Sequence, residues 1–281
     1  MPGLALTVLV DNSAIIDRYF LAEPGLSLFL DCGETKVLFD AGYSDIFLKN
    51  AEKMGIDLLD LDYVVLSHGH VDHTGGLMPL VFRHLEATIE GRPHRSPTIV
   101  AHPSCFFPRP IGPLANAGSP VSEDELRRQF PATLTSSPLW LTDDLVFLGE
   151  IPRPEVLPVQ DQHLIVTPSG TEADRLLDDS ALVYRSGSGL VIITGCSHAG
   201  IINIVRYAQE VCKTEEIRDV IGGFHLYDAG PHEIGRIADE FAVLKPAALH
   251  PCHCTGLAAS MALLQVAPVK ETGVGLRLEY Q

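Results

Sequence analysis

"VVLSHGHVDHTGGL", residues 64–77, is the stretch of sequence that decides the fold and the chemistry. It begins with an apolar, β-branched run of the kind that forms a buried strand, and it ends in a double glycine that favours a turn. Between these lie His68, His70, Asp72 and His73. Their imidazole and carboxylate groups are common ligands of zinc, manganese and ferrous iron. We therefore expect a metal-binding loop at the carboxyl end of a buried strand.

The spacing of these side chains indicates two metal positions. Side chains alternate along a strand, so a strand cannot present all four on one side, whereas a turn can. His68 and His70 are expected to bind one ion, and the bending chain directs Asp72 and His73 to a second. Two divalent ions roughly 4 Å apart can activate water and polarise a substrate oxygen. We expect two zinc ions, with manganese or iron as alternatives, and a catalytic role for Asp72.

Length and composition limit the class of protein. The 281 residues fit one large domain over the whole chain. No apolar run reaches the roughly 18 residues of a membrane span, and no signal peptide is evident, so a cytoplasmic protein is expected. A net charge of −16 disfavours nucleic-acid substrates. Six cysteines without a secreted-domain framework are expected to be reduced thiols. Nothing in the sequence indicates an oligomeric state.

The order of the expected elements is that of an α/β protein with two sheets and helices outside them. Apolar runs bounded by turn residues predict the strands, and longer amphipathic runs predict the helices. Strands are expected at Leu4 to Val10, Leu26 to Asp31, Lys36 to Phe39, within "LDYVVLSH", at Ala181 to Tyr184 and Leu190 to Thr194, within "RDVIGGFHL" and near the C-terminus; helices are expected at Ser44 to Met54, Gly200 to Cys212 and His232 to Leu244.

Residues from about 82 to 168 differ in character, because most of the prolines lie here between short apolar runs. Proline removes a backbone donor and interrupts both helices and central strands. The segment is expected to be an insertion folded over one end of the scaffold. It would form either a wall of a substrate pocket or a loop elaboration without a ligand role.

The motif H-x-H-x-D-H at His68, His70, Asp72 and His73 resembles that of the metallo-β-lactamase-fold superfamily. "TVLVDN", "LSHGHVDHTGGL", "TGCSHAGIINIV", "GGFHL" and "HCTG" resemble its branch of 7,8-dihydropterin-6-methyl-4-(β-D-ribofuranosyl)aminobenzene 5′-phosphate synthase-like proteins. This resemblance implies a four-layer αββα sandwich. Through the match of "VLFDAG", it also implies that Asp40 supports the metal loop.

The resemblance implies further ligands, but this sequence departs from the pattern. The superfamily usually adds a histidine, a bridging aspartate and a final histidine, whereas "GCSH" stands here where the bridging aspartate is common. Either Cys196 takes that place as a thiolate or His198 reaches the metal, and we favour His198 with Cys196 beside it. A small buried cysteine that only packs is the alternative. Asp179 lies near the position of the third histidine, as a ligand, an acceptor for a histidine N–H or a turn residue.

The last ligand implied by the resemblance lies in "LHPCHCTG". His253 matches H-C-T-G and is chosen over His250. A separate zinc knot of this Cys-x-Cys with two histidines is the lesser alternative, because structural zinc usually takes four ligands from two spaced pairs. His225, after a strand and two glycines, is expected to face the same pocket. There it would either donate a proton or bind the phosphate of the substrate. It would otherwise be a strand-end histidine bonded to backbone.

The remaining charged residues give weaker indications. His84, His94, His102, His163 and His232 are interpreted as surface or insertion residues, with His102 the best placed to line a pocket. Arg109, Arg153 and Arg175 could clamp phosphate, or be exposed charges that aid solubility.

The function expected from these features is that of a metal-dependent hydrolase or transferase acting on a small anionic substrate. That substrate would bear a phosphate or diphosphate and could be pterin-like. A ligand-sensing protein that retains the metals without efficient turnover is the main alternative. A nuclease and a redox di-iron protein are lesser ones.

Overall fold

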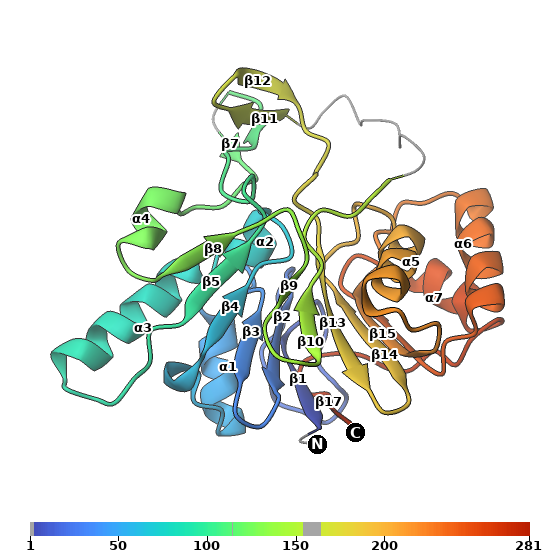
Figure 1. Cartoon of the computed structure of the whole chain (residues 1–281), viewed down its shortest axis with the longest axis horizontal. Coiled ribbons are helices and arrows are strands. Elements are labelled where there is room, and N and C mark those ends of the chain that lie inside the picture. The colour runs from blue at the N-terminus through green and yellow to red at the C-terminus, as the bar shows by residue number, and fades with distance from the viewer. Residues whose placement is uncertain (1–2, 114, 154–163) are drawn as a thin grey trace.

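The computed structural model describes residues 3–113, 115–153 and 164–281. Over these residues most strands form two large sheets that pack face to face (Figure 1). The first sheet has the order β17 (Arg277–Tyr280), β1 (Leu4–Val10), β2 (Ser27–Asp31), β3 (Lys36–Phe39), β4 (Tyr63–Val65), β5 (Thr98–Ala101), β8 (Ala132–Leu134). The second has the order β16 (Leu249–Cys252), β15 (Ile217–Gly223), β14 (Gly189–Thr194), β13 (Ala181–Ser186), β10 (Leu145–Phe147), β9 (Leu139–Trp140).

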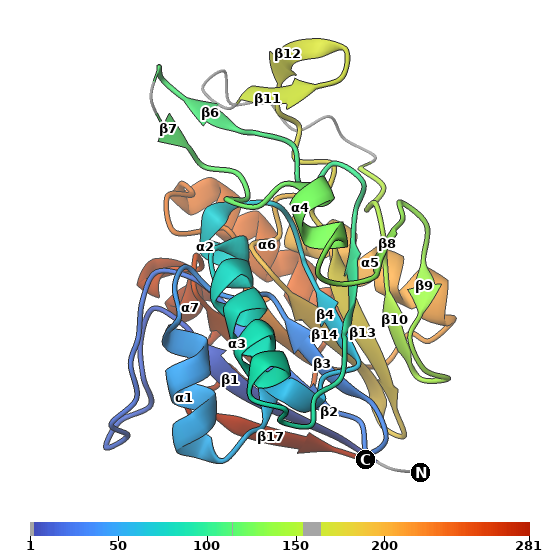
Figure 2. The same cartoon turned by 90° about the vertical axis from the view of Figure 1, so that its left-hand side faces the viewer.

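Helices cover the outer face of each sheet, which makes four layers. α1 (Ile46–Met54) and α3 (Leu77–Ile89) lie on the first sheet, and Figure 2 shows them in front of it. α5 (Ile201–Cys212), α6 (Pro231–Leu244) and α7 (Leu257–Leu263) lie on the second sheet (Figure 1). The expected αββα sandwich is therefore confirmed.

The alternation of side chains along the strands explains the layers, because successive residues point to opposite faces. In β14, Val191 and Ile193 belong to the core between the sheets. Leu190 and Ile192 belong to the core under α5 and α6. A separate outer core, which includes Phe29 of β2, lies under α1 and α3. Both faces of each sheet are thus apolar and buried.

The proline-rich segment is not one insertion, as was expected for residues 82–168. Its first residues complete α3, and β5, β8, β9 and β10 belong to the two sheets. Strands of two to four residues fit between the prolines, and "TIVA" pairs in parallel with β4. The parts that project from the sandwich are the hairpins β6 (Pro110–Ile111) to β7 (Ala115–Asn116) and β11 (Leu164–Thr167) to β12 (Gly170–Ala173) (Figures 1 and 2).

Short helices complete the description: η1 (Leu58–Asp60), α2 (Val71–Thr74) and α4 (Glu123–Arg127). α2 contains part of the histidine-rich loop and follows β4 directly, so this loop begins at the carboxyl end of a central strand. Among the described residues, no helix combines the length and the apolar character needed to cross a membrane.

Candidate metal centre

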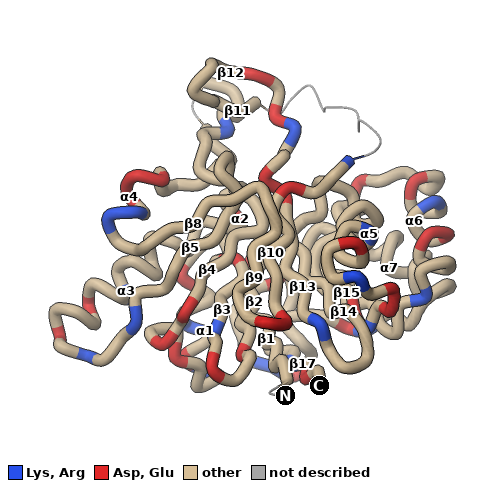
Figure 3. The backbone as a smooth tube through the Cα atoms, viewed as in Figure 1, with Lys and Arg blue, Asp and Glu red and all other residues tan. Residues whose placement is uncertain are grey.

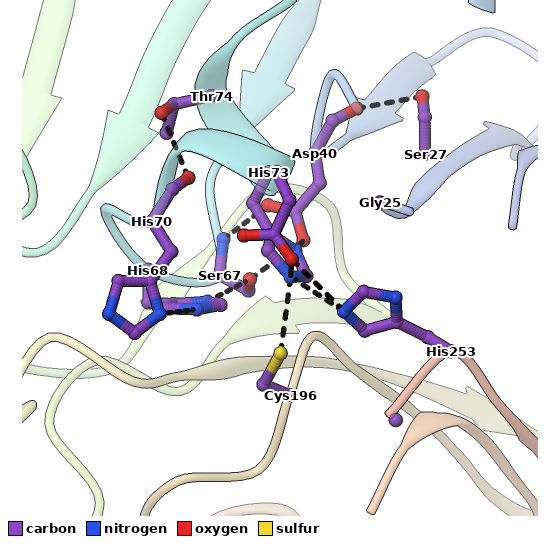
Figure 4. A network of polar contacts seen from close by, with 12 residues as sticks. Gly25, Ser27, Asp40, Ser67, His68, His70, His73, Thr74, Cys196 and His253 are labelled. Atoms are coloured by element: carbon purple, nitrogen blue, oxygen red, sulfur yellow. Dashed lines mark hydrogen bonds and ion pairs between the residues drawn. The ribbon is translucent and has the colours of Figure 1, made fainter. Parts of the chain in front are cut away.

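The expected site residues come together at one edge of the sandwich. β14, β15 and β16 run parallel, so the loops that follow them leave at the same edge of the second sheet. β3 and β4 are parallel in the first sheet. The loops after β3 and β4 face those after β14 and β16, and Figure 4 shows side chains from both sheets pointing toward one another. The sandwich thus gathers polar side chains from distant segments.

The first group consists of His68, His70 and His198. One ligand atom from each lies within 4.8 Å of the others. His68 Nε2 is 3.0 Å from His70 Nδ1, and the buried Nε2 of His198 has no hydrogen-bond partner among the described residues. Nitrogen ligands of a tetrahedral zinc ion, each about 2.0–2.1 Å from the metal, lie roughly 3.3 Å apart. The convergence of three imidazole nitrogens therefore fits a cation.

The second group consists of Asp72, His73, Cys196 and His253, again within 4.8 Å of one another. His73 Nε2 lies 3.2 Å from Cys196 Sγ and 3.2 Å from His253 Nε2. Asp72 Oδ2 lies 3.4 Å from His253 Nε2. A carboxylate, two imidazoles and a thiol are a ligand set that zinc accepts. The rings of His68 and His73 are 4.3 Å apart, so the two groups are neighbours.

Asp40 and Ser67 orient the histidines from behind. Asp40 Oδ2 accepts hydrogen bonds from His73 Nδ1 and Ser67 Oγ, both at 2.7 Å. Ser67 Oγ also lies 2.9 Å from His68 Nδ1. A hydrogen bond at Nδ1 leaves the lone pair of Nε2 for a metal. This is the supporting position that the resemblance implied for Asp40.

The N-terminal strand β1 orients His253 in the same way. Asp11 Oδ1 accepts a hydrogen bond of 2.8 Å from the backbone N–H of His253. Asn12 Oδ1 accepts one of 3.1 Å from His253 Nδ1. The motif "TVLVDN" therefore serves the site by holding the final histidine with its Nε2 toward the second group.

The surroundings lower the pKa values of the three histidines in the first group but raise the pKa of His73 in the second. Burial lowers the pKa of His68 and His198 well below the ordinary value, and burial together with nearby Arg109 lowers that of His70 to about 3. Burial also lowers the pKa of His73, but Asp72 and Asp40 overcome this and raise it to about 9. The first group is thus neutral near pH 7 and ready to bind a cation. His73 must release a proton on binding metal.

Asp72 is a carboxylate at neutral pH. Burial raises its pKa, but His73 and His253 lower it more strongly, so the pKa lies well below the ordinary value. An ionised carboxylate beside two imidazoles is suited to a divalent cation.

Asp179 is not a member of either group. It is fully buried, and its Oδ2 accepts a hydrogen bond of 2.9 Å from the backbone N–H of Ala199. It therefore holds the turn that carries His198. Burial raises the pKa of Asp179 to about 7.

We expect Asp179→Asn to flatten the pH dependence of stability in protein treated with a metal chelator. Between about pH 4 and 7 the folded state keeps the Asp179 proton and the unfolded state does not. The free energy of unfolding therefore falls as pH rises, by at most about 1.4 kcal/mol per pH unit, and this loss is complete above the folded pKa. Urea unfolding of both proteins at pH 4.5 and 7 measures the difference. Equal slopes would contradict this assignment.

The C-terminal residues divide between the site and the core. His253 faces the site, whereas the His250 ring lies 2.8 Å from Asp219 and is buried. Cys252 belongs to the core between the sheets. The alternative of a separate zinc knot is therefore wrong. His250 contacts Asp219 and Cys252 lies in the core, whereas His253 and Cys254 lie at the site.

Cys254 is the site residue that the sequence analysis missed. Its Sγ lies within 4.8 Å of Cys196 and His225 ligand atoms. Hydrogen bonds from Cys196 and His225 lower the pKa of Cys254, although its burial raises it. Burial lowers the pKa of His225, but contact with Cys254 raises it more. In a fully extended chain Cys252 and Cys254 would face the same side. The left-handed backbone of His253, with φ of 51°, changes the direction of the chain between them, so their spacing gave no signal for Cys254.

A cavity of about 950 Å³ opens over the groups. Its volume suits a small molecule with a ring system. The residues that line it include His70, Asp72, Cys196, His198, His225, His253, Cys254, Arg153, Arg175, Ile151, Leu176, Leu177 and Tyr227. His225 thus faces the cavity, as expected.

Arg109 does not line this cavity, so its expected role as a phosphate clamp is wrong. Its guanidinium is buried, with Nε 2.7 Å from Asp174 and Nη2 2.7 Å from Asp178. Two carboxylates therefore neutralise it. Asp178 Oδ2 also accepts a 2.7 Å hydrogen bond from the backbone N–H of Gly69, which ties this ion pair to the metal loop.

The other histidines that the structure describes lie outside the two groups. His102 is not among the residues lining the cavity; it is buried and contacts Ser104 and Glu150. His84 is buried in α3 rather than on the surface, because it packs against Phe130. His94 and His232 are exposed. His163 lies outside the described residues.

Comparisons with known proteins agree with this geometry. The family model described as Metallo-beta-lactamase superfamily matches residues 22–253. An uncharacterized protein of Methanocaldococcus jannaschii is 30% identical over 93% of this chain and 94% of its own. The 7,8-dihydropterin-6-methyl-4-(beta-D-ribofuranosyl)-aminobenzene-5′-phosphate synthase of the same organism is 27% identical over 92% of this chain and 89% of its own.

The solved structures include a close match over the whole chain. The crystal structure of Tm1679, a metal-dependent hydrolase of the beta-lactamase superfamily, has a TM-score of 0.83 at 30% identity and covers 99% of both chains. The histidine motif, the four layers and these matches lead to one assignment. The chain belongs to the metallo-beta-lactamase superfamily.

Proposed function

We propose that this protein is a metal-dependent hydrolase or transferase that acts on a small, phosphate- or diphosphate-bearing substrate at a centre of two divalent ions. The observation that carries the proposal is the convergence of two adjacent ligand groups beneath one cavity. Bound there, divalent ions would supply activation of a water molecule and polarisation of a substrate oxygen. Zinc is the expected metal, because imidazole, carboxylate and thiolate suit it together.

The chain supplies the remaining steps through residues at the cavity wall. His225 lines the cavity and its buried Nδ1 has no hydrogen-bond partner among the described residues. Contact with Cys254 raises its pKa despite burial, so when it binds no ion it can hold a proton and donate it to a leaving-group oxygen. Asp72 stays ionised, and its Oδ2 lies 3.7 Å from His73 Nε2 and 3.4 Å from His253 Nε2, so it would hold the same ion as these two histidines.

Charge and shape at the cavity wall support an anionic substrate with an apolar body. Arg153 and Arg175 lie on one part of the wall. Arg153 donates to the backbone carbonyls of Arg175 and Leu176, which fixes this part of the wall. Leu177 and Tyr227 offer apolar surface for a ring. The name of the M. jannaschii synthase, which includes a pterin and a 5′-phosphate, agrees with this class of substrate.

The distribution of charge favours a small substrate over a polynucleotide. Figure 3 shows Lys and Arg scattered among Asp and Glu along the drawn chain, without a continuous basic band. A polynucleotide needs such a band to neutralise its phosphates.

The test begins with elemental analysis of protein purified without added metal, which should contain at least two equivalents of divalent metal per chain. The metal-replete protein is then screened against phosphodiesters, lactones and pterin diphosphates. Turnover of a phosphate-bearing compound that a chelator abolishes and zinc restores would support the proposal. Metal-replete protein that turns over none of these would instead support the ligand-sensing alternative.

We expect Arg175→Gln to weaken binding of a phosphate-bearing substrate. The side chain is exposed at the cavity wall, so the change removes a positive charge without leaving a buried group unpaired. KM should rise by about 10-fold with little change in kcat, the pattern of an interaction made equally in the ground and transition states. Steady-state kinetics measure both constants. Arg185→Gln, which removes a charge on β13 outside the cavity, should leave KM unchanged.

A further inference from the structure

A third group of metal-ligating side chains adjoins the two already described. It consists of Cys196, His225 and Cys254, each of which offers a ligand atom within 4.8 Å of the others. The three come from the loops after β14, β15 and β16 respectively. Cys254 belongs to neither of the first two groups, whereas Cys196 is shared with the second.

The backbone around this group is arranged to bring the three side chains together. A Cβ on Gly223 would lie 2.6 Å from Cys254 Sγ, so only glycine leaves room for the thiol there. His225 and His253 both have a left-handed backbone, with φ of 52° and 51°. Such a conformation costs roughly 1–3 kcal/mol at a residue other than glycine and concentrates at functional sites.

Hydrogen bonds fix the two loops relative to each other. The carbonyl of Cys254 accepts from the backbone N–H groups of Leu226 and Tyr227, each at 3.1 Å. Cys254 Sγ lies 3.5 Å from the carbonyl oxygen of Cys196. The buried Nδ1 of His225 has no hydrogen-bond partner among the described residues. A preformed pair of thiols therefore stands beside the imidazole of His225.

We propose that Cys196, His225 and Cys254 form a third cation position, selective for a thiophilic divalent ion such as zinc. Two thiolates and one imidazole are three protein ligands, and all three side chains line the cavity. Three protein ligands with a fourth position open to the cavity are the arrangement of catalytic rather than structural zinc. On binding, the protons held by the two sulfurs and by the coordinating nitrogen of His225 pass to solvent, and no electron is transferred. The Cys196 thiolate then contacts two ions.

Metal stoichiometry tests this position in the full chain, kept reduced by a phosphine. Zinc-loaded wild-type protein should retain about three equivalents after removal of free metal, and Cys254→Ser about two. His225→Ala should lose the same equivalent. Cys32→Ser, which removes a partly buried thiol at the β2–β3 turn, should retain the wild-type content.

Cobalt substitution supplies a second measurement that does not depend on activity. Sulfur-to-cobalt charge transfer in the near-ultraviolet reports thiolate–metal bonds. Cys254 would contribute one such bond and the shared Cys196 two. In Cys254→Ser the band should fall to about one third of wild type, because only the bond from Cys196 to the second group remains. The proposal is overturned if Cys254→Ser and His225→Ala, folded by circular dichroism, both keep the wild-type stoichiometry and band.

Discussion

His70→Ala is expected to lower kcat/KM of the metal-replete protein by about 1000-fold and to remove one bound ion. The first group would keep only His68 and His198, and two imidazoles are too few to hold zinc firmly. Loss of one ion from a two-metal centre removes several kcal/mol of transition-state stabilisation, and about 4 kcal/mol corresponds to this factor in rate. Elemental analysis and steady-state kinetics on the same preparation measure both effects.

His232→Ala is the matched control, because His232 is exposed at the start of α6. It should keep the wild-type metal content and rate. If His70→Ala behaves like this control in both measurements, the assignment of the first group is wrong. If His70→Ala loses the ion but keeps the wild-type kcat/KM, that ion has no part in catalysis. The proposed function would then be wrong, although the assignment of the metal site would still hold.

Much of the site could be predicted from the sequence because its central part is local. The partition into His68 with His70 and Asp72 with His73 follows from the alternation of side chains entering a turn. The structure places these pairs in separate groups. Two strands of the first sheet were also predictable, since β1 and β3 are apolar runs that end in polar turns. Local patterns of this kind require no knowledge of distant contacts.

The errors concern residues whose environment depends on distant segments. Arg109 lies among prolines and resembles a surface charge, yet Asp174 and Asp178 bury it. Cys254 was considered only as part of a separate zinc knot, because the loop after β15, which brings His225 to it, is distant in the sequence. The range 82–168 was misjudged because β5 lies between Pro97 and Pro103, which favour loops, and its place in the sheet becomes clear only from its pairing with β4.

The stability of the metal loop depends on Arg109, and Arg109→Met is expected to destabilise the protein by about 3–5 kcal/mol. The substitution keeps much of the side-chain volume but leaves Asp174 and Asp178 buried without their cation, and an uncompensated buried charge carries a cost of this size. Urea unfolding at pH 7 measures the change. Arg206→Met removes an arginine from an exposed pair with Glu240 and should cost about 1 kcal/mol or less.

The same substitution should also weaken metal binding in the protein that remains folded. Asp178 accepts the Gly69 N–H at 2.7 Å, and a Cβ on Gly69 would lie 1.9 Å from the Cys105 carbonyl oxygen and 2.2 Å from Arg109 Nη1. The backbone between His68 and His70 therefore rests directly on the Arg109 ion pair. Loss of a group that orients metal ligands typically lowers affinity by about 10–100-fold. Competition with a chelator measures it. Unchanged affinity alongside lowered stability would mean that Arg109 supports the fold without positioning the loop.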